Sequence, residues 1–126
     1  MGIMHVGAVV RRGDGRGKGV EVRLLVDTGA VYSVLPHQVW RTLKLRPMDR
    51  AEFALADGSV ISRDVSECRF EIHGKAATSP VVLGEGGEGP LLGAVTLETL
   101  GLMLNPLTRE IRPMRLLLAG VARAVG

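Results

Sequence analysis

The chain has 126 residues, of which 46% are hydrophobic and only 3% are aromatic, and its formal net charge is +3. This composition supplies an aliphatic core for one domain of ordinary size. It excludes a disordered chain, which would have few aliphatic residues and a large charge imbalance. The small positive charge identifies no class of partner. We therefore expect residues 1–126 to form a single domain.

The N-terminal part of the sequence predicts two strands joined by a flexible turn. Residues 6–10 are an apolar run with strand character, and residues 11–19 contain four glycines, which is typical of a turn. Residues 20–24 alternate apolar and polar side chains, as a half-buried strand does. Residues 24–26 are all apolar and lead directly to Asp27. This pattern predicts a fully buried strand that ends at an acid.

The middle of the chain predicts a short helix followed by several strands. Residues 36–43 are predicted to be helical, because Pro36 suits a first helical turn and the apolar side chains recur at three- and four-residue spacing. The strands that follow are spaced by about ten residues, which favours an antiparallel β architecture. The predicted strands are residues 51–56, 60–61, 65–72 and 76–83, with turns at residues 57–59, 63–64 and 73–75.

The C-terminal part predicts a loop, a very short strand and a second helix. Residues 84–90 form a glycine-rich loop, and the two leucines that follow form a buried strand ending at Gly93. Residues 95–102 are predicted to be helical, with Thr96 as a possible N-cap. The remaining elements are a turn at Asn105-Pro106 and final strands at Ile111 and at residues 115–118.

Three features occur in an informative order along this sequence. An apolar strand leads to Asp27-Thr28-Gly29, the turn Asp57-Gly58-Ser59 follows about thirty residues later, and Leu91-Leu92-Gly93 directly precedes a short helix. This order resembles that of the retropepsin-like aspartic proteases, the retroviral-type peptidases with bacterial and archaeal relatives. The resemblance extends over residues 20–113. It is carried by residues 25–30 with 33–36 as the active-site segment, by residues 91–94, and by residues 53–58 as the approach to the flap.

The resemblance implies a mainly β fold, a closed β-barrel of the retropepsin-like acid protease type with one or two short helices. It also implies an aspartic endopeptidase in which Asp27 is catalytic. In this family, the residue at the position of Thr28 hydrogen-bonds across to the other half of the site, and Gly29 supports the active-site turn. The residues expected to bind substrate are Ala30, Asp57, Gly58 and Ser59.

The chemistry of peptide hydrolysis explains why this family needs a carboxyl group at the position of Asp27. Two carboxyls close together cannot both ionise, so they share a proton and titrate as a pair. The ionised carboxylate takes a proton from a water molecule, while the protonated one polarises the peptide carbonyl. The sequence contains one Asp-Thr-Gly segment and no Asp-Ser-Gly. We therefore expect a homodimer, whose two-fold axis passes between two Asp27 side chains, acting on a peptide or protein substrate.

Two other interpretations of these motifs compete with catalysis. Asp27 is also a residue type that commonly starts a turn. The chain is alternatively a non-catalytic dimerisation or peptide-binding module that retains the fold. The glycine-rich residues 13–19 do not match a phosphate-binding loop, because Lys18 is followed by Gly19 rather than by Ser or Thr. The nearby basic residues have no aromatic neighbours for base stacking, so we expect solvated loop charge and no nucleic-acid partner.

The remaining reactive side chains predict no metal or cofactor site. His5, His37, His73 and Cys68 show no metal-ligand spacing, and Cys68 alternates with apolar residues as a small core residue does. The longest apolar run near the C-terminus, residues 116–122, is far shorter than the ~20 residues that a membrane span needs. A single cysteine and an N-terminus unlike a secretory leader favour a cytoplasmic location.

Overall fold

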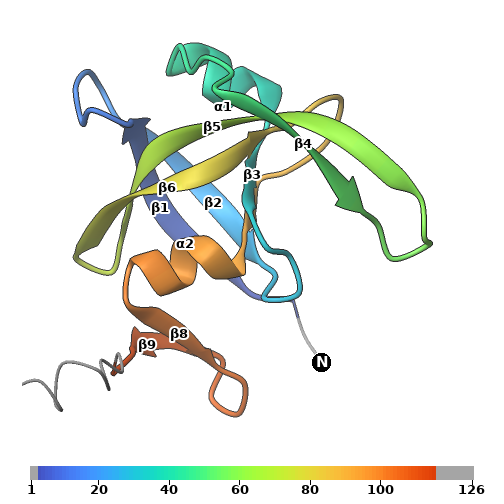
Figure 1. Ribbon diagram of the computed structural model, residues 1–126. Helices are drawn as coiled ribbons and strands as arrows, with labels where there is room; N and C mark the ends of the chain where they lie inside the picture. Colours follow the sequence, from blue (N-terminus) through green and yellow to red (C-terminus); the bar gives the residue numbers. More distant parts are fainter. Residues whose placement is uncertain (1–2, 116–126) are drawn as a thin grey trace, which may run out of the picture.

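The computed structural model describes residues 3–115, and within these residues the chain forms nine strands and two short helices (Figure 1). The elements, in chain order, are β1 (His5–Arg12), β2 (Val20–Val26), β3 (Ser33–Leu35), α1 (His37–Thr42), β4 (Asp49–Ala54), β5 (Val60–Ile72), β6 (Lys75–Leu83), β7 (Leu91–Leu92), α2 (Ala94–Thr99), β8 (Leu102–Asn105) and β9 (Glu110–Pro113).

Six of the strands close into a barrel. Their order around the sheet is β1-β2-β7-β3-β6-β5, and β1 pairs with β5 to complete the ring. Most neighbours are antiparallel, but β2 pairs with β7 and β3 pairs with β6 in parallel. The barrel removes the unpaired edges that an open sheet would expose. The predicted mainly β fold, a closed barrel with one or two short helices, is therefore confirmed, and the helices number two among the described residues.

The barrel encloses an aliphatic core, as the composition predicts. Val10, Leu24 and Leu35 are completely buried, and Phe70 is the largest side chain among them. In β1 and β2 the buried residues alternate with exposed ones, because successive side chains of a strand point to opposite faces of the sheet. Cys68 is also completely buried in this core, which confirms its assignment as a core residue.

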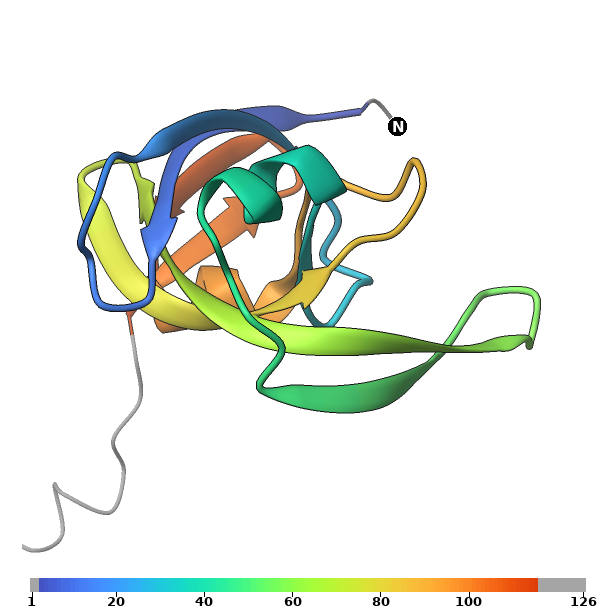
Figure 2. The same ribbon diagram turned by 90° about the horizontal axis from the view of Figure 1, so that it is seen from above.

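The β4–β5 ribbon, residues 49–65, leaves the barrel as a two-stranded hairpin (Figure 2). The predicted turn at residues 63–64 is wrong, because both residues lie inside β5, a single strand of 13 residues. The polar pair Arg63-Asp64 resembles a turn only because this half of β5 lies outside the barrel, where no core face requires apolar side chains. The predicted turn at residues 57–59 forms the tip of the ribbon.

Two further elements differ from the sequence-based expectation. Strand β3 is not among the predicted strands, although its three residues lie in the segment that carries the family resemblance. Helix α2 begins at Ala94 and Gly93 is its N-cap, so the assignment of Thr96 as N-cap is wrong. Strand β8 begins at Leu102, where the second helix was expected to end, and it pairs with β9. Residues 116–118 of the last predicted strand lie outside the described residues.

Helix α1 forms where the sequence predicts it. Pro36 is its N-cap, and Trp40 packs against the barrel core. The indole N–H of Trp40 donates a hydrogen bond of 3.0 Å to the carbonyl of Gly84, at the start of the loop that follows β6. None of the helices among residues 3–115 has the length and apolarity that crossing a membrane requires.

Candidate active site

Asp27 lies immediately after β2, at the start of a short connection that we call the Asp27 loop, residues 27–32. Its backbone N–H donates a 3.0 Å hydrogen bond to the carbonyl of Leu92, and its carboxylate accepts a 3.0 Å bond from the N–H of Gly29. The turn is closed by a 3.1 Å bond from the Ala30 N–H to the Asp27 carbonyl. The carboxylate is thus held by its own loop, which restricts where it can point.

The environment of Asp27 is more open than the sequence predicts. Leu24 is completely buried, but Leu25 and Val26 are only half-buried, and Asp27, Thr28 and Gly29 are exposed. The predicted fully buried strand is therefore wrong over its last two residues. Leu25 and Val26 lie at the end of the barrel, where no other element among the described residues covers them completely.

Strand β7 and helix α2 support the Asp27 loop from behind. Leu25 and Val26 pair with Leu91 and Leu92 in parallel. The first amides of α2 donate to the carbonyls of the loop, Ala94 to Ala30 at 2.8 Å and Val95 to Val31 at 3.0 Å. These bonds satisfy helix N–H groups that have no partner within the helix, and they fix the loop at the same time.

Three buried hydroxyls lie behind the same loop. Thr96 bonds to Ser33 at 2.5 Å and to Ser79 at 2.9 Å, and Ser33 accepts a 2.9 Å bond from the N–H of Gly93. All three side chains are at most 1% exposed, so these bonds replace those lost to water. The cluster joins β3, β6 and α2 at the base of the Asp27 loop. The sequence did not predict that Thr96 and Ser79 would bond to each other behind the Asp27 loop, because hydrogen-bond partners so far apart along the chain leave no local pattern.

An apolar cleft lies between the Asp27 loop and the β4–β5 ribbon. Its volume is about 340 Å³. The ring of Tyr32, in the Asp27 loop, meets the ring of Phe53, in β4, edge to face with centroids 5.9 Å apart. Ala30, which was expected to bind substrate, lines the cleft. The other apolar side chains that line it include Val34, Leu55, Ile61, Val82 and Leu91.

The three predicted ribbon-tip residues, Asp57, Gly58 and Ser59, are exposed and do not line this cleft. Asp57 accepts hydrogen bonds from the Ser59 hydroxyl at 2.6 Å and from the Ser59 N–H at 2.9 Å. These bonds hold the pKa of Asp57 below its usual value. Gly58 has a φ of 88°, which suits glycine in a tight turn. Hydrogen bonds within the tip thus define its conformation, but the tip does not line the cleft.

Arg63 and Glu88 line one part of the cleft and were not predicted from the sequence. The Arg63 guanidinium contacts both Glu88 carboxylate oxygens, with Nε to Oε1 at 2.9 Å and one terminal nitrogen to Oε2 at 2.5 Å. The hydrogen bond from Arg63 lowers the pKa of Glu88, and the same bond raises the pKa of Arg63. The two charges come from β5 and from the 84–90 loop, so only the folded chain brings them together.

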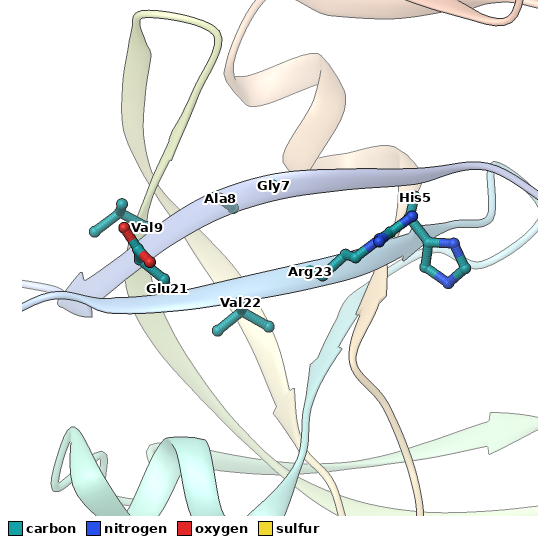
Figure 3. A pocket seen from close by; sticks show the side chains of 7 residues that line it. All are labelled: His5, Gly7, Ala8, Val9, Glu21, Val22 and Arg23. Carbon is teal, nitrogen blue, oxygen red and sulfur yellow. The ribbon is translucent and has the colours of Figure 1, made fainter.

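A larger hollow of about 630 Å³ lies on the outer face of the β1–β2 hairpin (Figure 3). Figure 3 shows His5 and Arg23 at one end of the hollow and Glu21 at the other. No residue of the Asp27 loop lines it. The smaller cleft, in contrast, is lined by Ala30 and Tyr32 of the Asp27 loop, so it is the better candidate for chemistry at Asp27.

The other reactive groups of the described chain are inert or scattered. Burial raises the pKa of the Cys68 thiol to about 12, which keeps it protonated at neutral pH. Among residues 3–115, no three or more His, Cys, Asp and Glu side chains lie close enough to hold a metal ion. Asp27, with its turn and the neighbouring cleft, is therefore the candidate centre.

Comparisons with known proteins agree with this geometry. The sequence model of the family described as gag-polyprotein putative aspartyl protease matches residues 14–99. The solution structure of the simian foamy virus (mac) protease is similar to the chain, with 18% sequence identity and a TM-score of 0.54, over 75% of this chain and 92% of the viral one. That likeness shows a shared fold. A search among curated proteins finds no match. The chain belongs to this gag-polyprotein aspartyl protease family and is a retropepsin-like aspartic protease by sequence and fold.

Proposed function

We propose that this chain is an aspartic endopeptidase whose active site is completed by a second copy of the chain. Each copy contributes Asp27, and the two carboxyls hold one water molecule between them. The observation that carries the proposal is the position of Asp27. It stands exposed at the end of a barrel strand, and its backbone N–H is hydrogen-bonded to the carbonyl of Leu92. The loop that it begins lines an apolar cleft through Ala30 and Tyr32.

The proposed reaction needs only these groups. The ionised Asp27 takes a proton from the water as the water oxygen attacks the peptide carbonyl carbon, and the protonated Asp27 of the second copy hydrogen-bonds to the carbonyl oxygen. The C–N bond then breaks, and a proton passes to the leaving nitrogen. Thr28 and Gly29 support the turn. Ala30 and the apolar cleft bind a substrate side chain, and the β4–β5 ribbon acts as a flap whose tip, residues 57–59, closes over the peptide.

The surface near Asp27 supports assembly of two copies. Val31, in the Asp27 loop, is 62% exposed, and Ile3 is 76% exposed. The β8–β9 hairpin carries Leu107 at its turn, 92% exposed, and Met103. In Figure 1 the Asp27 loop, the start of the chain and the β8–β9 hairpin lie at the same end of the barrel. Apolar side chains gathered at one end favour burial against another protein surface, and a second copy brings the second Asp27 there.

The test compares the chain with an Asp27→Asn variant on a peptide library between about pH 4 and pH 7, because the pH range in which a carboxyl pair shares one proton differs from pair to pair. Asp14→Asn is the matched control, because it removes the same charge from the β1–β2 loop, where the exposed Asp14 pairs with Arg12 and accepts a bond from the N–H of Arg16. We expect cleavage by the parent and by the control, and none by Asp27→Asn. Equal cleavage by all three proteins would contradict the proposal.

Sedimentation of the same samples tests the assembly. We expect a dimer for all three, because Asp27→Asn changes one oxygen for an NH₂ group and leaves the apolar surface intact. A dimer that binds peptides but cleaves none would favour the alternative function, a non-catalytic dimerisation or peptide-binding module. A strictly monomeric protein that cleaves would show that the second Asp27 is not needed.

A further inference from the structure

The β4–β5 ribbon has few means of support from the barrel. Among residues 3–115, β4 pairs with β5 alone, and the pairing of β5 with β6 begins at Val65. An isolated two-stranded hairpin is marginally stable in water. The continuous strand β5 joins the ribbon to the barrel, and side-chain contacts add to this support. The edge-to-face contact of Phe53 with Tyr32 is one of them.

The second contact is the ion pair of Arg63 and Glu88. The Arg63 side chain is 18% exposed, and its guanidinium forms two parallel bonds to the Glu88 carboxylate. A third bond, 2.7 Å to the carbonyl of Ser62, fixes the orientation of the guanidinium on β5. This planar fork is specific in geometry, and a lysine ammonium could not reproduce it. The ion pair therefore fixes a direction as well as a distance.

Glu88 is itself firmly placed. Its Oε1 accepts a 2.9 Å bond from the N–H of Glu85, and its own N–H donates a 3.1 Å bond to the Glu85 carbonyl. The neighbouring Gly89 packs so closely on β3 that an added Cβ would lie 2.9 Å from the carbonyl oxygen of Val34. The 84–90 loop is thus a fixed anchor on the barrel, and Arg63 is attached to it.

The anchor leads directly to the candidate catalytic residue. Two residues after Glu88, the carbonyl of Pro90 accepts a 3.1 Å bond from the N–H of Leu25, and Leu92 holds the N–H of Asp27. One short segment therefore contacts both the ribbon and the strand that ends at Asp27. The two halves of the cleft are joined through it.

We propose that the Arg63–Glu88 ion pair is a latch that holds the β4–β5 ribbon over the cleft in its closed position. The role of the latch in peptide binding rests on the proposed function, but the contact between Arg63 and Glu88 exists in the folded chain whether or not the chain cleaves peptides. A peptide enters when the two bonds between Arg63 and Glu88 break and the ribbon moves away from the cleft. When these bonds form again, the ribbon returns to a fixed position relative to Asp27. Arg63 and Glu88 are positioning residues in this account.

Amide hydrogen exchange measures the latch without any need for catalysis. The variants Glu88→Gln, Arg63→Gln and the charge-exchanged pair Arg63→Glu with Glu88→Arg are made in an Asp27→Asn background, which removes self-digestion. Glu71→Gln is the matched control, because Arg11 and Glu71 form a similar ion pair between β1 and β5, and Glu71 is 35% exposed against 34% for Glu88. Exchange is read over residues 49–63, with residues 20–24 of β2 in the barrel as an internal reference.

We expect both single variants to speed exchange in residues 49–63 by at least about threefold, because local opening governs exchange there. Residues 20–24 should not change in the single variants, and the ribbon should not change in the Glu71→Gln control. The charge-exchanged pair should recover part of the protection, because it restores the opposite charges but not the bonds to the Ser62 carbonyl and from the Glu85 N–H. Unchanged exchange in the ribbon would overturn the latch. An equal rise of the exchange rate in the barrel, with no recovery in the charge-exchanged pair, would also overturn the latch, because the ion pair would then only stabilise the fold. A chain that never cleaves a peptide, in contrast, would overturn the proposed function and leave this result intact.

Discussion

The backbone N–H of Asp27 donates a 3.0 Å hydrogen bond to the carbonyl of Leu92, so the end of β2 is held by the end of β7. This single bond connects two segments that are far apart in the sequence and that both carry the family resemblance. Because Gly93 follows Leu92 and begins the connection to α2, the position of the acid depends on close packing at this glycine.

Gly93→Ala should destabilise the chain and displace the Asp27 loop. A Cβ at this position would lie 2.6 Å from the backbone carbonyl of Tyr32 and 2.9 Å from the N–H nitrogen of Ser33, and a backbone cannot move aside as a flexible side chain can. We expect a loss of about 1–3 kcal/mol in the free energy of unfolding, the usual cost of overpacking. Urea denaturation measures it. Gly87→Ala, whose Cβ meets nothing within 4 Å, should change stability by less than about 0.5 kcal/mol.

Thr96→Val should lower the stability of the fold at the base of the Asp27 loop without changing the shape of the side chain. The substitution keeps the volume of the side chain but removes the hydroxyl that bonds to Ser33 and Ser79. We expect a loss of about 1–3 kcal/mol in unfolding free energy, because buried polar groups lose a partner. Thr99→Val is the control in the same helix. Thr99 is exposed and bonds only to the carbonyl of Val95, so a loss as large as that of Thr96→Val would contradict the account.

The protection of the β4–β5 ribbon should depend on pH through Glu88. The hydrogen bond from Arg63 lowers the pKa of Glu88 below its ordinary value of 4.5. A lowered pKa means that the ion pair contributes fully above the ordinary value and is lost as the pH falls through the lowered one. Exchange in residues 49–63, corrected for intrinsic rates, should therefore be flat from about pH 7 to pH 5 and rise below about pH 4.

Comparison with the Glu88→Gln variant isolates the contribution of Glu88. In that variant, the amides of residues 49–63 should exchange rapidly at every pH. Glu85 lies 3.8 Å from Arg63, and Asp57, at the tip of the ribbon, has a lowered pKa. Their contributions remain in the Glu88→Gln variant. If that variant shows the same acid-induced rise as the parent, Glu88 is not the group responsible.

Cys68 should be unreactive in the folded protein. Its thiol is completely buried, and burial raises its pKa to about 12, so almost none of it is the reactive thiolate at pH 8. Ellman's reagent should label no thiol in the native protein and one thiol per chain in denaturant, because the sequence has a single cysteine. Rapid labelling under native conditions would show that the barrel opens at β5.

The sequence predicts the parts of this structure that depend on local order. A strand that leads to Asp27-Thr28-Gly29 and two leucines before Gly93 are recognisable because each is a short segment with its own pattern. The family resemblance then implies that they meet, and the bond between Asp27 and Leu92 agrees. The short helix at α1 is equally local, since Pro36 and the apolar spacing define it.

The parts that the sequence does not predict depend on contacts between distant residues. Arg63 resembles a turn residue, and only the path of β5 out of the barrel brings it to Glu88, 25 positions away. Thr96 has the residue type of an N-cap, yet it is buried because β3 and β6 supply hydroxyl partners. The partial exposure of Val26 also contradicts its apolar pattern, and this is expected if a second copy covers that end of the barrel.

The central claim is that one active site contains an Asp27 from each of two copies. The most direct test mixes the parent chain with Asp27→Asn in varying proportions at a fixed total concentration, allows the subunits to exchange, and measures peptide cleavage. A shared site predicts that activity falls as the square of the parent fraction, so an equal mixture retains about a quarter of the activity. A linear fall, to about half at the same point, would show that each chain carries a complete site and would contradict the account.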